Sequence, residues 1–334
     1  MEKLDYKGVS TLSYMVDSGG RIRVIDVLRG FAIVLMLFQH TPLFFLNDLD
    51  SKLYIHALIA SRLSAPLFVL IVGYCIFLSG GRRIERSGRV GFLQHLVFRT
   101  FQLMALGCAI SIFRFESIFS LNVIHLIAFA VLFTGLLYLS TSRLAYAVTL
   151  TALSTYSLIG PEYNSGILVK TPIDSLAWLM TSGEYPTGSW MVYAIVGLGV
   201  AWFLRGVRVR WERIFYLGWI LIIASMALVL VGVKFDMVGN SAPFMFFILG
   251  AMVFVYVFGA YAARQEEWSF LSNPLAAFGR HSLPIYVVHQ FLFITVPRIG
   301  MFNNTLNEPE VVLLFLAFLA AAYAVIAAYE RRMC

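Results

Sequence analysis

Charged residues are scarce in this chain of 334 residues. Asp, Glu, Lys and Arg together make up 13% of the sequence, whereas 60% of the residues are hydrophobic. A soluble domain carries roughly 25% charged residues, and a soluble fold with this composition would expose far more apolar surface than monomeric proteins do. The formal net charge of +7 also occurs in nucleic-acid-binding proteins, but the apolar content argues against that class. We therefore expect an integral membrane protein with the lipid bilayer, and no nucleic acid, as its partner.

Cysteine is equally rare, and its positions exclude two kinds of site. The three cysteines are Cys75, Cys108 and Cys334. An odd number with no Cys-x-x-Cys spacing supports neither a disulfide framework nor a zinc site, so we predict no metal. Residues 1–20 also lack an apolar stretch followed by a small-residue cleavage site, which predicts that no signal peptide is removed and that the first helix remains as an anchor.

Familiar catalytic motifs are missing as well. The chain has no Gly-x-Ser-x-Gly elbow, no P-loop, no His-Glu-x-x-His and no Gly-x-Gly-x-x-Gly sequence. Their absence leaves the ionisable residues inside apolar segments as the main functional candidates, because such residues are costly in a bilayer.

Ten apolar runs are long enough to be considered membrane spans, which need about 20 mostly apolar residues. They cover roughly residues 24–46, 58–79, 92–113, 121–139, 143–160, 189–204, 214–232, 242–262, 281–298 and 310–329. We predict an all-α bundle of ten transmembrane helices. A single domain over residues 21–330 would lie between polar tails at 1–20 and 331–334, and Ser175–Met180 would form a short interfacial helix.

Basic residues predict the orientation of this bundle. With ten spans, eighteen of the 25 Lys and Arg residues lie on the side of the two termini and six on the other side. Arg99 lies within a span, near its cytoplasmic end. Because Lys and Arg accumulate in cytoplasmic loops, we expect both termini in the cytoplasm of a multi-pass protein of the cell membrane.

The first span carries two candidate site residues, Arg29 and His40. They are eleven residues apart, which is close to three helical turns, so both lie on one face about 16 Å apart along the axis. Asp26 lies on the same stripe. Arg29 could instead be an anchor that snorkels or pairs with Asp26, and His40 could be a capping or interhelical hydrogen-bonding residue.

The ninth span carries a second set of candidates. Ser282, Tyr286 and His289 share a face through their spacing, and His289 falls near the membrane midplane. Arg280 and His281 precede the helix, whose N-terminus favours phosphate. Interhelical packing is the alternative for His289, and a positive-inside flank is the alternative for the other two.

The ionisable candidates fall into two layers. Cations such as Arg99 gather on the predicted inner side, whereas His40, His289 and the outer His56 lie deeper or beyond. Neutral histidine is a suitable general base near pH 7. This layering suggests an anionic cofactor that enters from the cytoplasm and proton chemistry further out, unless the inner cations merely obey the positive-inside rule.

Several segments together resemble the transmembrane acyltransferase superfamily. Asp26-Val-Leu-Arg-Gly-Phe-Ala-Ile33 followed by His40 is similar to the opening of this group, which includes the acyltransferase-3 proteins and the heparan-alpha-glucosaminide N-acetyltransferase-like proteins. Arg29 and His40 match the acyltransferase-3 pattern of Arg, ten residues, His. Further similar blocks, in the expected order, are Ala65–Gly73, Asn122–Ala128, Tyr185–Trp190 and Gly279–His289.

The resemblance implies a membrane-bound O- or N-acyltransferase. It would take an acyl group, expected to be acetyl, from cytoplasmic acyl-CoA and pass it to a carbohydrate-type acceptor, a sugar or glycan, at the outer side. The roles that follow are His40 or His56 as base on the acceptor, His289 and Tyr286 at the thioester, and cations that hold the CoA phosphates. Those cations are Arg29, Arg99, Arg280 and His281.

Some points stay open at this level. The heparan branch tends to carry Asn at the position of His40 and a catalytic His in the following loop, where His56 could match, whereas this chain has both histidines. A transporter or flippase is the alternative function, although we find no inverted repeat with matching broken helices. A membrane scaffold or sensor is a third reading. The acceptor and the oligomeric state, with a homodimer as one option, are undetermined.

Overall fold

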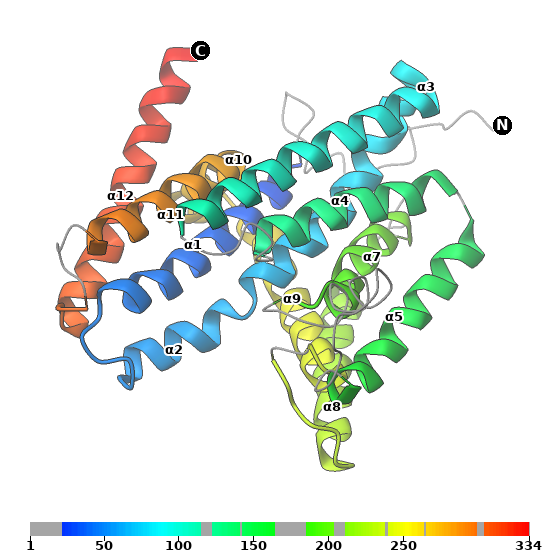
Figure 1. The fold of residues 1–334 in the computed structure, drawn as a ribbon, viewed down its shortest axis with the longest axis horizontal. Coiled ribbons are helices and arrows are strands. Elements are labelled where there is room, and N and C mark those ends of the chain that lie inside the picture. The colour runs from blue at the N-terminus through cyan, green and yellow to red at the C-terminus, as the bar shows by residue number, and fades with distance from the viewer. Residues whose placement is uncertain are drawn as a thin grey trace. The chain divides into compact units, whose positions relative to one another are not determined.

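The computed structural model describes residues 22–114, 122–140, 142–163, 185–203, 211–237, 240–263, 265–298 and 304–333. Within these ranges the regular structure is helical, and the only extended pairing is one isolated bridge between Leu46 and Leu306. The all-α prediction is therefore confirmed. The elements in chain order are α1 (Arg23–Phe45), α2 (Lys52–Ser61), α3 (Ser64–Phe113), α4 (Val123–Ser140), α5 (Arg143–Tyr163), α7 (Thr187–Phe203), α8 (Trp211–Leu230), α9 (Ala242–Ala262), the 3₁₀ turn η3 (Glu266–Trp268), α10 (Ser269–Arg280), α11 (Ser282–Arg298) and α12 (Glu308–Met333) (Figure 1).

Six of the described helices are long and apolar enough to cross a membrane. They cover Arg23–Phe45, Lys52–Phe113, Val123–Ser140, Glu212–Leu230, Ala242–Ala262 and Glu308–Arg332. Three shorter apolar helices cover Leu144–Ser154, Thr187–Trp202 and Ser282–Pro297. The chain is thus a multi-pass membrane protein. The total of ten spans and the cytoplasmic side of both termini stay predictions, and the interfacial helix predicted at Ser175–Met180 lies outside the described residues.

Helix ends differ from the ends of several apolar runs, and the predicted run 58–79 begins in α2 and continues in α3. The element α3 covers most of two predicted spans, and it consists of two helices that meet at a kink at Gly88, whose φ of 70° and ψ of 177° are not helical. Arg and Glu are good helix formers, so the first of these helices extends beyond its apolar run, which ends near residue 79, as far as the kink at Gly88. The predicted loop between residues 263 and 280 is also wrong in part, because it holds the helix α10.

The chain divides into two compact units. Unit 1 comprises Met1–Leu67 and Phe254–Cys334, and unit 2 comprises Phe68–Val253. Seven of the eight candidate site residues belong to unit 1, and Arg99 belongs to unit 2.

Helix α1 is the centre of unit 1. It packs against α2, α10, α11 and α12, and Figure 1 shows it running beside α2 and α10. Its buried residues lie around most of its circumference rather than in one stripe, as expected of a helix enclosed by neighbours. This enclosure holds the candidate site residues of α1 among packed neighbours.

Two glycines allow α1 and α10 to touch through their backbones. A Cβ atom at Gly30 would overlap the carbonyl oxygen of Leu275, and one at Gly279 would overlap the carbonyl oxygen of Asp26. Small residues at helix crossings permit such close approach inside membranes. Because Gly30 follows Arg29 and Gly279 precedes Arg280 in the chain, this crossing also positions the two arginines.

Aromatic side chains of α1, α11 and α12 pack together near the C-terminal end of α1. The ring of Phe293 lies 5.4 Å from that of Phe45 and 4.9 Å from that of Phe318. Beyond this cluster, the backbone of Leu306 accepts from Asn47 N–H at 2.9 Å and donates to the carbonyl of Phe45 at 3.0 Å. These contacts tie the start of α12 to the end of α1.

In unit 2, glycines likewise allow the backbones of α3 and α7 to touch. A Cβ atom at Gly73 would overlap the carbonyl oxygen of Ala194, and one at Gly197 would overlap that of Leu70. The buried cluster around this crossing consists of Ile76, Phe92, Leu96, Tyr146, Ile195 and Leu198.

Candidate active site

The structure brings two of the predicted histidines into direct contact. His40 of α1 and His289 of α11 are 249 positions apart in the chain, yet His40 Nδ1 lies 3.2 Å from His289 Nε2. Their ring centroids are 5.2 Å apart and their planes differ by 14°. A nitrogen–nitrogen contact of this length requires a shared proton, so the two imidazoles form one hydrogen-bonded pair.

The two members of the pair differ in their surroundings. His289 is 4% exposed and sits against the rings of Tyr286 and Phe293, with centroid distances of 5.1 and 5.5 Å. His40 is half-buried and has Phe44 at 6.3 Å. His40 is therefore the more accessible member of the pair.

Helical periodicity explains why α11 presents these groups together. Tyr286, His289 and Phe293 are separated by three and four residues, so their side chains share one face. All three are buried, as is Gln290 beside them. The predicted common face of Tyr286 and His289 is thus present.

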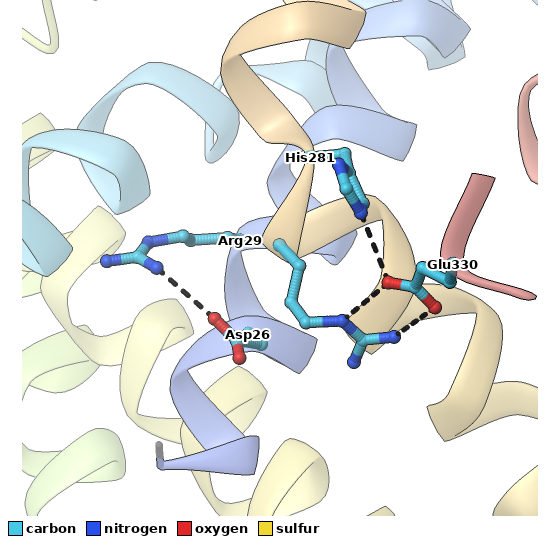
Figure 2. Close-up of polar contacts among 5 residues, drawn as sticks. Asp26, Arg29, His281 and Glu330 are labelled. Carbon is cyan, nitrogen blue, oxygen red and sulfur yellow. Dashed lines mark hydrogen bonds and ion pairs between the residues drawn. The ribbon is translucent and has the colours of Figure 1, made fainter. Parts of the chain in front are cut away.

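A second polar group lies at the junction of α10 and α11. Arg280 donates from Nε and Nη2 to the two carboxylate oxygens of Glu330, each at 2.9 Å, and His281 Nε2 lies 3.1 Å from Glu330 Oε1. Figure 2 shows this group and, separately, the ion pair of Arg29 with Asp26, whose Nη1 to Oδ1 distance is 3.2 Å. The pairing of Arg29 with Asp26, anticipated as an alternative, is therefore observed.

The cationic side chains Arg29, Arg280 and His281 lie at a different level of unit 1 from the histidine pair. Along α1, eleven residues separate Arg29 from His40, which is about 16 Å at 1.5 Å per residue. Along α11, eight residues separate His281 from His289, which is about 12 Å. Within unit 1 the cations therefore form one layer and the histidine pair another.

The sequence of this chain matches a known protein family. The family described as "Heparan-alpha-glucosaminide N-acetyltransferase, catalytic" matches residues 21–207, more than half of the chain. The chain belongs to this family. A search among curated proteins finds no match. Family membership makes the protein a membrane acetyltransferase in broad terms and favours an enzyme over a transporter or a scaffold.

The family match covers some candidate residues and not others. Arg29, His40, His56 and Arg99 lie within residues 21–207. The partners from α10 and α11, among them His289, lie beyond it. The histidine pair therefore joins a residue of the matched region to one outside it.

Two candidates stand apart from the pair in their own settings. His56 lies on α2 with an exposed side chain, whereas the buried face of that helix carries Ala57 and Ser61. Arg99 lies on α3 in unit 2, where its exposed side chain donates from Nη1 to Gln102 Oε1 at 3.4 Å.

Another histidine in unit 2 has a structural role. His125 Nδ1 accepts a hydrogen bond from the backbone N–H of Asn122 at 3.3 Å, and its Nε2 lies 3.6 Å from Cys108 Sγ. Since Nδ1 supplies a lone pair, the neutral ring carries its proton on Nε2. That nitrogen therefore donates toward the sulfur and cannot take a proton from it, which argues against a Cys–His nucleophile here.

Sequence reasoning missed Gln290 and Glu330, two residues of unit 1 whose polar side chains contact the candidates. Gln290 places its amide Nε2 3.1 Å from His289 Nε2, and Glu330 binds Arg280 and His281. A signal for Gln290 was present, because it is an amide inside an apolar span next to a candidate histidine. Glu330 stands out only as a carboxylate just before the basic C-terminal flank, next to Arg331.

Proposed function

We propose that this protein transfers an acetyl group from acetyl-CoA to a hydroxyl or amine of a carbohydrate acceptor. The donor would bind from the cytoplasm at the cationic layer, and the acceptor would reach the histidine pair from the outer side of the cell membrane. The observation that carries the proposal is the contact between His40 Nδ1 and His289 Nε2 at 3.2 Å. It supplies a reachable base with a buried partner, which is the arrangement that general-base catalysis needs.

In this mechanism His40 takes the proton of the acceptor group as that group attacks the thioester carbonyl. The new carbon–oxygen or carbon–nitrogen bond forms, the carbon–sulfur bond breaks, and the departing CoA thiolate recovers the proton. His289 orients His40, and the hydroxyl of Tyr286 would stabilise the negative oxygen of the tetrahedral intermediate. His56 is the second candidate for the base.

The phosphates of CoA would be held by Arg29, Arg280 and His281 of unit 1, whereas Arg99 of unit 2 stays a candidate from the sequence alone. Arginine suits this task because its planar group forms paired, charge-assisted hydrogen bonds with phosphate oxygens. The two layers of unit 1 support the proposal, since the extended pantetheine arm would bridge the distance between cations and histidines.

Acetyl-CoA binding tests the proposed function most directly. Acetyl-CoA should raise the melting temperature of the purified protein in detergent, because a ligand at 100 times its dissociation constant stabilises the folded state by about 2.7 kcal/mol. Pantetheine, which lacks the phosphates, is the control and should give a much smaller shift. If no acyl-CoA of a chain-length series changes the melting temperature, the proposed function is wrong.

Replacing Arg280 by glutamine tests the phosphate assignment. Hydrogen bonds to charged groups contribute about 1.5–3 kcal/mol, so we expect the dissociation constant of acetyl-CoA to rise tenfold or more. Glu330→Gln is the matched control, because it removes the counterion of Arg280 and leaves the cation. Its affinity for acetyl-CoA should be equal to or higher than that of the wild type. Equal losses in both variants would indicate that Arg280 matters only for holding Glu330.

A further inference from the structure

Arg62 follows the end of α2 in unit 1, and contacts on both sides of it give its depth along α1. Near the start of α2, the backbone N–H of Leu53 donates to Glu308 Oε1 at the start of α12, at 3.4 Å. Just past the end of α2, the hydroxyl of Ser64 donates to the carbonyl of Ala32 at 2.8 Å. Helix α2 therefore returns from the C-terminal end of α1 to the middle of that helix, and Arg62 lies there.

The middle of α1 is also the middle of a segment long enough to span the membrane. Ala32 lies about 14 Å from the first residue of α1 and about 20 Å from the last, at 1.5 Å per residue. It comes three positions after Arg29 and eight positions before His40. Arg62 is thus a cation near mid-membrane, between the level of the other cations and that of the histidine pair.

The guanidinium of Arg62 differs from those of two other arginines of unit 1. Arg29 pairs with Asp26, and Arg280 pairs with Glu330. In contrast, Nε of Arg62 is buried and has no hydrogen-bond partner among the residues that the structure describes. A buried charge without a partner is costly, and charged side chains inside membranes commonly mark paths for ions or substrates. Arg62 therefore has hydrogen-bonding capacity left for an anion.

The backbone next to Arg62 adds to this positive charge. Helix α2 ends at Ser61 and α3 begins at Ser64, so two helices are interrupted at Arg62. The first N–H groups of a helix have no partner within it and carry a partial positive charge. Interrupted membrane helices commonly direct such N-termini at anionic groups of a substrate. The start of α3 thus places backbone donors within a few residues of the arginine.

We propose that Arg62, together with the N-terminus of α3, binds the diphosphate of the acyl donor. This role rests on the proposed function and deepens it, because it names the part of CoA that reaches mid-membrane. In CoA the diphosphate lies between the nucleotide, which carries the 3′-phosphate, and the pantetheine arm, which carries the thioester. Arg62 lies in the same order between the level of Arg29 and that of His40. A planar guanidinium forms paired, charge-assisted hydrogen bonds with phosphate oxygens.

Affinities for a graded set of donors test the proposal. In the full chain, reconstituted in lipid nanodiscs, Arg62→Gln should raise the dissociation constant of acetyl-CoA about tenfold or more. The factor should be the same for acetyl-dephospho-CoA, which lacks only the 3′-phosphate, and should disappear for S-acetylpantetheine, which has no phosphate. Equal losses for all three donors, or no loss for any, would overturn the proposal. A loss confined to acetyl-CoA would assign Arg62 to the 3′-phosphate and would overturn it too.

The melting temperature of the ligand-free protein separates binding from a structural role. Because Arg62→Gln removes a buried charge without a partner, the variant should melt at the same temperature as the wild type or higher. Inorganic diphosphate, a probe independent of acyl transfer, should raise the melting temperature of the wild type more than that of the variant. A ligand-free variant that melts earlier and shows the same diphosphate shift as the wild type would assign Arg62 a structural role instead.

Two further variants complete the test. Lys52→Gln is the control, because it removes a cation at the exposed start of α2, and it should leave all affinities unchanged. Arg62→Lys keeps the charge but not the paired hydrogen bonds, so it should lose less affinity than Arg62→Gln, and it keeps the test open if the Gln variant does not fold. Weaker binding by Arg62→Lys than by Arg62→Gln would contradict a role for the charge.

The two proposals can fail separately. A diphosphate shift that depends on Arg62, in a protein that binds no acyl-CoA, would count against the proposed function alone. Binding of acetyl-CoA that is unchanged in Arg62→Gln would count against the role of Arg62 alone.

Discussion

Replacement of His40 by alanine is expected to lower the rate of acetyl transfer by about 10²–10⁴-fold, the usual contribution of a general base. The side chain is the more accessible member of the histidine pair, and alanine has no lone pair with which to take the proton. The rate can be followed as CoA thiol released from acetyl-CoA in the presence of a glucosamine acceptor. His40 is only half-buried, so the variant should stay folded and keep its affinity for acetyl-CoA.

Two companion variants separate the roles of the histidines. His289→Ala should also lower the rate strongly, because His40 would lose the group that orients it. His56→Ala should have little effect if His40 is the base. A fast His40→Ala protein together with an inactive His56→Ala protein would transfer the role to His56. Full activity in both the His40 and the His289 variants would remove the pair from the mechanism.

Substitution of Gly30 by alanine should destabilise the protein severely, because the added methyl group would overlap the carbonyl oxygen of Leu275. An extra methyl group in a packed core usually costs about 1–3 kcal/mol, but here it meets backbone, so α1 and α10 would have to separate. We expect the loss to exceed that range and the yield of monodisperse protein to collapse in size-exclusion chromatography. Gly279→Ala should behave alike, since its methyl group would meet the carbonyl of Asp26.

Gly259 provides the control for this pair in the same unit. Its nearest neighbour would be Cδ2 of Leu28 at 3.2 Å, the end of a flexible side chain that can move aside. Gly259→Ala should therefore melt within a few degrees of the wild type. A Gly30→Ala protein as stable as the Gly259→Ala protein would show that the backbone contact between α1 and α10 does not hold the unit together.

Hydropathy predicts the membrane helices well and the helices between them poorly. The predicted run 24–46 differs by one residue at each end from α1, because such a span must be apolar throughout. α10 escapes this criterion because it has only 12 residues, with Ser, Asn and Arg among them. Leu275 and Phe278 lie in the core, whereas Asn273 and Arg280 are exposed. The extension of the first helix of α3 past its apolar stretch to Gly88 is not predicted either, since hydropathy marks a membrane boundary and not a helix end.

The candidate site shows a similar division. Spacing within one helix predicts that Tyr286 and His289 share a face, because that relation depends on local geometry alone. It does not predict that His40 meets His289, since no local pattern tells which helices pack together. The same limit hides Glu330, whose partners Arg280 and His281 lie about fifty positions earlier.

The contact between His40 and His289 also has a consequence for biosynthesis. Unit 1 is discontinuous, and all of unit 2 lies in the chain between its two parts. A ribosome must therefore translate the whole of unit 2 before the second histidine exists, and a nascent chain shorter than 289 residues holds only half of the pair. If the pair carries the chemistry, a premature stop codon after unit 2 would leave an inserted but inert protein, and no growing chain could consume acetyl-CoA before its synthesis is nearly complete.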